Sequence, residues 1–254
     1  MHAAPDSERD GGPASADVLL DPARVGAVER LLSALDDTTG IDRIVRLAAL
    51  LLHAPVAQVS LVSQEQVIAG TAGSSASLDS PGQAEGSLST ATLRTGTPLV
   101  VGDAASDERV ARLPPVASGA VGGYLGVPLI DSDGHRLGAL CVRTPEPRTW
   151  SPHDVGVLVE LAGSAVAELE LRAISQDARR SVARLGLALE AAAIGSFDLD
   201  LATQRLHWDD RLIRLFGYDA STFVPHLESF NARVHTDDAA RVNDAIEAAI
   251  GEPT

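Results

Sequence analysis

The stretch from His135 to Leu171, HRLGALCVRTPEPRTWSPHDVGVLVELAGSAVAELEL, decides the fold of this chain. Its first part, Leu137 to Val142, is short, apolar and rich in Gly and Ala, which predicts a strand buried on both faces. Pro145 and Pro147 follow, and because proline lacks a backbone donor, neither a strand nor a helix can continue through them. The stretch therefore predicts a strand, a turn and then a new element.

That element is a long helix with a well-marked start. Ser151 is a suitable N-cap, Pro152 stands where a missing N–H does no harm, and Asp154 completes a capping-box arrangement. The apolar residues that follow recur at steps of three and four, as expected for one buried stripe: Val155, Leu158, Val159, Ala162, Ala165, Val166 and Leu169. We expect this stripe to pack against a partner surface, and Leu169 to contribute to self-association of the chain.

Length and charge limit the classes of function. A chain of 254 residues is long enough for two ordinary domains. A net charge of −15 argues against a nucleic-acid-binding surface, which needs clustered Lys and Arg. Every basic residue is Arg, so a lysine Schiff base and a GK[ST] phosphate loop are both excluded.

Cysteine usage and hydropathy suggest where the protein is located. Cys141 is the single cysteine, which allows neither an intrachain disulfide nor an all-cysteine metal site and fits a reducing cytoplasm. No run reaches 18 apolar residues, so we predict no membrane span. Residues 1–23 begin polar and acidic, without the pattern of a secretory signal, and we interpret them as a disordered tail.

Two helices and two strands are expected ahead of the opening stretch. Apolar residues spaced as on one helix face predict helices over 24–36 and 41–54, and β-rich runs predict strands over 56–62 and 67–72. A further helix is expected from Ser87 to Arg94, followed by TGTPLVVGDAASDERV.

These motifs together resemble a GAF domain. The likeness rests on the short helix before TG-x-PLVV-x-DA-x-x-D, on the GALCV strand, and on Trp-Ser-Pro-His-Asp at the start of the long helix. It spans about residues 25–173 and implies an antiparallel sheet with helices on one face, and strands over 125–130 and 135–142. The family's pocket would lie between the sheet and the crossing segments, with these candidate ligand-binding residues: Ser87, Thr90, Arg94, Asp103, Arg109, Tyr124 and Cys141.

The C-terminal part has a different character, because all four Phe residues lie there. The runs IGSFDLDL, LHWDDRLIRLFGYD and FNARVHTDDAARVNDAI resemble the first part of a PAS domain of the PAS_3 subgroup, over about residues 186–250. The last three strands of such a sheet are not in this sequence, so we expect them from a longer chain or from a partner. The resemblance gives a candidate PAS pocket of Phe197, Trp208, Leu212 and Phe216.

The predicted fold class is α+β: an antiparallel-sheet GAF domain, a long connecting helix and a partial PAS domain. The expected boundaries are 1–23 for the tail, 24–172 for the GAF domain, 173–193 for a signalling helix and 194–254 for the PAS part. Sparse apolar residues in the helix predict a homodimer, with a solvated connector as the alternative.

Cofactors and metals have few candidate residues. Cys141 reads as a small core residue, and residues 87 and 89, near the helix over the pocket, are Ser, so a bilin is disfavoured. Cyclic nucleotides are disfavoured because the family signature for them needs Lys, and flavin because the PAS part has no Cys. Haem binding is left open. No His has the spacing of a metal site, and we predict neither a metal nor a catalytic residue.

Three functions remain open. The first is a cytoplasmic sensory module that binds an unidentified small ligand and passes the signal through a dimeric helix to an output domain or partner, such as a histidine kinase or a metal-dependent Ser/Thr phosphatase. The second is an enzyme acting in the GAF pocket. The third is a dimerisation module whose pocket is filled by its own side chains.

Overall fold

The computed structural model describes residues 18–73, 84–200 and 205–251. Most of the predicted tail lies outside these ranges. Its last residues do not: Val18–Leu20 form a 3-10 helix, η1, in which Leu19 is buried. The chain divides into two compact units, one on each side of the Asp177–Ala178 bond.

The N-terminal unit is built on a five-stranded antiparallel sheet with strand order β2-β1-β5-β4-β3. The strands are β1 (Val56–Val62), β2 (Gln66–Ala72), β3 (Leu99–Val101), β4 (Gly123–Ile130) and β5 (Arg136–Thr144). Strand β5, which lies in the opening stretch of sequence, is central, and its burial on both faces was predicted correctly. The predicted α+β class with an antiparallel sheet is confirmed.

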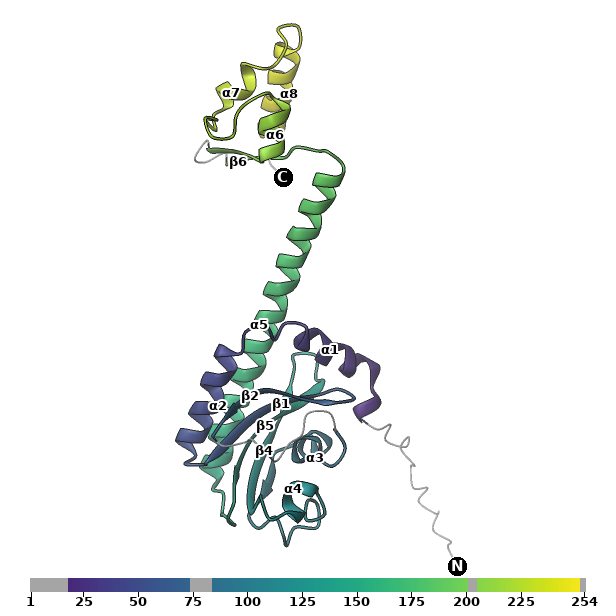
Figure 1. Cartoon of the computed structure of the whole chain (residues 1–254), viewed down its shortest axis with the longest axis vertical. Helices are drawn as coiled ribbons and strands as arrows, with labels where there is room; N and C mark the ends of the chain where they lie inside the picture. Colours follow the sequence, from purple (N-terminus) through teal and green to yellow (C-terminus); the bar gives the residue numbers. More distant parts are fainter. Residues whose placement is uncertain (1–17, 74–83, 201–204, 252–254) are drawn as a thin grey trace, which may run out of the picture. The chain divides into compact units, whose positions relative to one another are not determined.

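Helices cover one face of this sheet, as Figure 1 shows. They are α1 (Pro22–Leu32), α2 (Thr39–Leu51) and the first half of α5 (Pro152–Ala191). Their apolar stripes share one core with residues such as Val59, Leu140 and Leu125 of the sheet. The opposite face is covered by α3 (Leu88–Thr95) and α4 (Pro114–Ala117) around a second, smaller core.

The start of α5 has the predicted capping box. The backbone N–H of Ser151 donates to the Asp154 carboxylate at 2.8 Å, and the N–H of Asp154 donates to Ser151 Oγ at 3.2 Å. The hydrogen bonds from the Ser151 backbone and hydroxyl lower the pKa of Asp154, since they stabilise its charged form.

Most of the predicted stripe of α5 packs within its own unit, although Val159 is 41% exposed. Leu158, Ala162 and Leu169 are buried against the sheet, and Leu169 is 1% exposed. Its predicted place in a dimer seam was therefore wrong, because this face of the helix is already occupied. Beyond Ala173 most large apolar residues of α5 are exposed: Ile174, Val182, Leu185 and Leu187 are 61–72% exposed, whereas Leu189 is half-buried.

A buried arginine links η1 to the end of strand β1. Arg24 is 1% exposed, and its guanidinium donates to the carbonyls of Val18 at 2.8 Å, of Leu19 at 2.9 Å and of Val62, the last residue of β1. It therefore fastens η1 to the sheet.

The C-terminal unit contains a two-stranded antiparallel sheet and three short helices among its described residues. These are β6 (Phe197–Asp200), β7 (Arg205–Trp208), α6 (Asp210–Leu215), α7 (Leu227–Asn231) and α8 (Ala239–Gly251). The strands pair in register, so that Phe197 lies opposite Trp208 and Leu199 opposite Leu206. Aromatic rings form the centre of its core.

Candidate functional site

The predicted residues at the start of α3 hold the helix in place. Ser87 is the N-cap and accepts from the N–H of Thr90 at 3.1 Å. The Thr90 hydroxyl donates to the carbonyl of Ala84 at 2.7 Å. Both side chains are buried, and their hydrogen-bonding groups are engaged in capping.

Tyr124 occupies the space between the sheet and α3. The side chain is fully buried; its hydroxyl lies 2.7 Å from Thr92 Oγ1 and donates to the carbonyl of Leu88 at 3.2 Å. The Tyr124 side chain also lies over Gly126, where an added Cβ would be 2.3 Å from the phenolic oxygen. Glycine at that position leaves room for Tyr124, which fills part of the predicted pocket itself.

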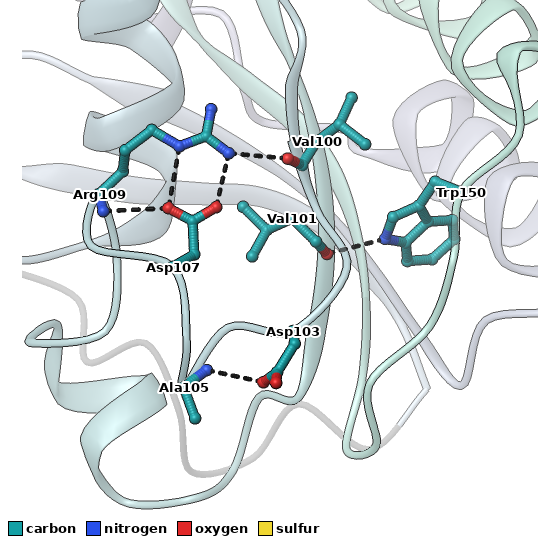
Figure 2. Close-up of polar contacts among 7 residues, drawn as sticks. All are labelled: Val100, Val101, Asp103, Ala105, Asp107, Arg109 and Trp150. Atoms are coloured by element: carbon teal, nitrogen blue, oxygen red, sulfur yellow. Dashed lines mark hydrogen bonds and ion pairs between the residues drawn. The ribbon is translucent and has the colours of Figure 1, made fainter.

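The segment after β3 is shaped by its own polar contacts, which Figure 2 shows. The Arg109 guanidinium forms two hydrogen bonds to Asp107, at 2.9 and 2.6 Å, and a third to the Val100 carbonyl at 2.9 Å. The hydrogen bonds from Arg109 lower the pKa of Asp107, and Asp107 in turn raises the pKa of Arg109. Asp103 accepts from the N–H of Ala105 at 3.2 Å and caps a turn.

These contacts are local. The candidate ligand-binding residues of the GAF domain fall into an exposed group and a buried group. The side chains of Arg109 and Arg94 are about half exposed, at 54% and 47%, and Arg94 lies 4.0 Å from the exposed Glu85. Ser87, Thr90, Tyr124 and Cys141 are buried instead.

Sequence reasoning missed a set of buried polar residues on the sheet face that lies toward α3. Gln58 and Ser60 alternate with the apolar residues of β1, and Gln58 Nε2 donates to Ser60 Oγ at 2.7 Å. Gln58 pairs in register with Cys141, and Arg143, 3% exposed, pairs with Tyr124. The sequence of β1, VAQVSLV, could have predicted this set, because Gln58 and Ser60 are two residues apart and such side chains lie on the same face of a sheet.

The C-terminal unit contains a partly open cavity of about 440 Å³. All four residues predicted for this region line it: Phe197, Trp208, Leu212 and Phe216. The remaining lining residues come from both strands, their flanks and helices α7 and α8: Gly195, Leu199, Leu206, Phe230, Arg241, Val242, Ala245 and Ile246. The walls are therefore mainly apolar and aromatic.

Two local features position these walls. The ring of Trp208 lies 4.8 Å from that of Phe216 and 4.9 Å from that of Phe223, centroid to centroid. Asp209 caps α6 by accepting from the N–H groups of Leu212 and Ser196, both at 2.7 Å. Burial acts to raise the pKa of Asp209, but these hydrogen bonds outweigh it and the pKa is lowered.

Comparison with protein families is consistent with both parts of this description. The profile of the GAF domain matches residues 29–169, more than half of the chain. The chain belongs to the GAF domain family. A second profile, described as a PAS fold, matches residues 205–254. A search of curated proteins finds no match.

Solved structures include relatives of each part. The GAF domain of an Acinetobacter phosphoenolpyruvate-protein phosphotransferase is 15% identical, with 61% of this chain and 98% of that chain covered and a TM-score of 0.46. The blue-light absorbing form of the PixJ GAF domain of Thermosynechococcus elongatus is 15% identical, with coverages of 65% and 98% and a TM-score of 0.45. The PAS domain of a GGDEF family protein from Chromobacterium violaceum is 37% identical, with coverages of 21% and 50% and a TM-score of 0.21.

A GAF domain followed by a PAS fold supports a sensory signalling module. Within the described ranges, no helix is both long and apolar enough to cross a membrane.

One cluster in the GAF domain has the composition of a metal site. Ligand atoms of Asp131, Asp133 and His135 lie within 4.8 Å of one another in the β4–β5 turn. The Asp131 carboxylate, however, accepts from the N–H groups of Asp133 at 3.1 Å and His135 at 2.7 Å. These hydrogen bonds give the cluster a structural role in closing the turn.

Proposed function

We propose that this chain is the sensory part of a signal-transduction protein and that its PAS cavity binds a small apolar ligand. The observation that supports this most directly is the cavity of about 440 Å³, which all four predicted pocket residues line. Cavities that bind small molecules usually have volumes of about 300–1,000 Å³ and mainly apolar walls.

The walls define the class of ligand. Arg241 is the charged residue among them, and its guanidinium already binds the Asp238 carboxylate at 2.8 Å. Phe197 lines the cavity while 68% exposed, so a bound apolar molecule would remove its ring from water. An uncharged or weakly polar molecule therefore suits the site better than a nucleotide or an amino acid.

The same walls bear on cofactors. Among the residues described around this cavity there is no His, Cys, Met or Tyr, which are the usual axial ligands of haem. A flavin–cysteine adduct would also lack its thiol. We propose that the ligand is held by packing alone.

Filling the cavity tests the proposal. Ala245 and Ala248 lie on α8, but only Ala245 lines the cavity, so Ala248→Phe is the matched control for Ala245→Phe. We expect decanol or indole to raise the melting temperature of the full chain and to change Trp208 fluorescence, and Ala245→Phe alone to abolish both responses. Equal responses in the two variants, or no response in the native chain, would refute the cavity as a ligand site.

A second candidate site lies in the GAF domain, and the buried polar groups of Gln58, Ser60 and Arg143 favour it. A small number of polar groups in a mainly apolar wall fix the orientation of a bound ligand, which suits a polar ligand near this sheet face. Amino acids or nucleotides that raise the melting temperature of the native chain but not that of Gln58→Leu would support this site. Absence of any response would favour a GAF domain that Tyr124 and its neighbours fill.

A bilin remains disfavoured in our proposal. Cys141 is 2% exposed on the central strand β5, paired between Gln58 and Gly126, and the residues at the start of α3 are Ser87 and Ser89. Absorption spectra of the chain produced together with a bilin supply would test this, and a covalent visible chromophore would overturn it.

The relay, the partner and the location complete the proposal. We infer that α5 passes the signal as a homodimer to an output domain or partner, such as a kinase or phosphatase, and that the protein acts in the cytoplasm. A ligand that prefers one of two helix packings would shift their populations by its difference in affinity.

A further inference from the structure

The C-terminal end of α5 has a backbone conformation that its residue does not favour. The N–H of Ile194 donates to the Leu189 carbonyl at 3.0 Å, and the N–H of Ala193 donates to the Glu190 carbonyl at 3.1 Å. This pair of hydrogen bonds is a Schellman motif, in which the residue after the cap, here Ala193, adopts the left-handed conformation. The φ angle of Ala193 is 59°, a region that a residue with a Cβ enters only with strain.

Three other helices end on glycine instead. Within two residues of their last residue, α3, α4 and α6 have Gly96, Gly119 and Gly217, each with a positive φ. Glycine adopts this conformation without strain, because it has no Cβ. The strained end of α5 therefore depends on the contacts that the chain makes just after Ala193.

Those contacts belong to the wall of the PAS cavity. Gly195, two residues after Ala193, lines the cavity, and so does Leu212 of α6. The two residues pack so closely that a Cβ added to Gly195 would lie 2.8 Å from the Cα and Cβ atoms of Leu212. A molecule that fills the cavity therefore contacts both residues at the point where the chain leaves α5.

The Asp209 carboxylate joins the same two segments. Its Oδ2 accepts from the backbone N–H and the hydroxyl of Ser196, both at 2.7 Å, and its Oδ1 accepts from the N–H of Leu212 at 2.7 Å. The N–H of Asp209 donates in return to the Ser196 carbonyl at 3.0 Å. These hydrogen bonds, which we call the clasp, fix the residue after Gly195 to the first turn of α6.

We propose that occupancy of the PAS cavity controls the last turn of α5. In the closed junction, residues 192–196 keep the Schellman motif and the clasp. In the open junction, Ala193 leaves the left-handed conformation and the N–H of Ile194 loses its bond to α5. A ligand that packs on Gly195 and Leu212 favours the closed junction by its difference in affinity for the two states. The inference rests on the proposed function and adds the element that the ligand regulates.

Hydrogen exchange of the full chain, with and without decanol, is the direct test. At a decanol concentration of about ten times its dissociation constant, the amides of Ile194 and Ser196 should exchange about 10-fold more slowly. The amides of Gly217 and Tyr218 are the internal control, because they make the corresponding bonds at the end of α6 and neither residue is among those described as lining the cavity. Equal slowing at both helix ends would reflect stabilisation of the whole unit and would overturn the proposal.

Ala193→Gly tests the strain. Glycine relieves the left-handed conformation, so the Ile194 amide should exchange about 5-fold more slowly in the chain without decanol. Ala188→Gly, inside α5, is the matched control and should speed this exchange, because glycine weakens a helix. Faster exchange in Ala193→Gly, or the same change in both variants, would contradict the strained junction.

Asp209→Asn tests the clasp. Asn has one acceptor oxygen where the carboxylate has two, so it cannot both cap Leu212 and hold Ser196 as Asp209 does. Decanol should still raise the melting temperature of this variant, but the slowing at Ile194 should be lost, and Ser196→Ala, which removes the hydroxyl bond alone, should lose part of it. Slowing that persists in Asp209→Asn would reject the clasp as the link.

The two proposals fail in different ways. If decanol leaves the melting temperature of the native chain unchanged, the cavity is not its binding site and the proposed function fails. If decanol raises the melting temperature without slowing exchange at Ile194, the ligand site stands and the control of α5 is refuted.

Discussion

Replacing Arg24 by Met would remove the group that fastens η1 to the sheet while keeping a side chain of similar length. Arg24 is 1% exposed and donates to the carbonyls of Val18, Leu19 and Val62. A buried acceptor that loses its donor costs about 1–3 kcal/mol, and hydrogen bonds from a charged donor contribute about 1.5–3 kcal/mol each. The η1 carbonyls can return to water if η1 detaches, so these costs do not add fully.

We therefore expect the free energy of unfolding of the GAF domain to fall by about 2–5 kcal/mol. For a domain of this size that corresponds to a decrease of about 5–15 °C in its melting temperature. Calorimetry measures the transition, and the fluorescence of Trp150, in the GAF domain, assigns it. Arg24→Lys should recover only part of the loss, because an ammonium group cannot reproduce the planar fork of a guanidinium.

Arg30→Met is the control for this experiment, since Arg30 lies on the same helix and is exposed. A melting temperature for Arg24→Met equal to that of Arg30→Met would refute the assignment of Arg24 as the fastening residue. The transition reported by Trp208, in the other unit, should be the same in both variants.

Three more predictions concern the GAF domain. Tyr124→Phe should lower its stability by about 1–2 kcal/mol in urea titrations, because Thr92 Oγ1 and the Leu88 carbonyl each lose one buried hydrogen bond and keep the one between them; no loss would show that the hydroxyl is not needed. Hydrogen bonds from Thr39 hold the pKa of Asp37 at about 2, so the stability it contributes should be complete above its ordinary pKa and lost as pH falls through 2; thermal melts of Asp37→Asn should differ from native at neutral pH and coincide in strong acid. Gly138→Ala should destabilise by about 1–3 kcal/mol, because its Cβ would lie 1.9 Å from the carbonyl oxygen of Ser60; an unchanged melt would contradict this.

The local elements could be predicted because each depends on neighbours in sequence. Ser151, Pro152 and Asp154 fix the start of α5 whatever packs beside it, and the run around Cys141 had the composition of a central strand. The resemblance to a PAS domain supplied Phe197, Trp208, Leu212 and Phe216 as candidates, and all four line the cavity of the C-terminal unit. That they bind a ligand stays a prediction.

The GAF ligand set was harder to predict, because a pocket position does not tell whether a side chain is used for binding or for packing. Tyr124 is engaged by the hydroxyl of Thr92, 32 residues earlier in the chain. The buried polar residues Gln58 and Ser60 were overlooked because the strand was assessed by its overall apolar composition and not separately for each of its two faces.

By itself, the sequence determined most of the helices and strands of the GAF domain, the start of α5 and its apolar stripe, because these follow from local spacing and backbone chemistry. The short elements η1, β3 and α4 were not predicted. Only the tertiary structure decided which stripe meets the sheet, burying Leu169 and leaving Leu171 exposed. It also placed the Arg24 guanidinium against carbonyls of β1 and η1. The physical reason is that periodicity fixes which residues share a face, whereas burial depends on groups that the chain brings together from distant positions.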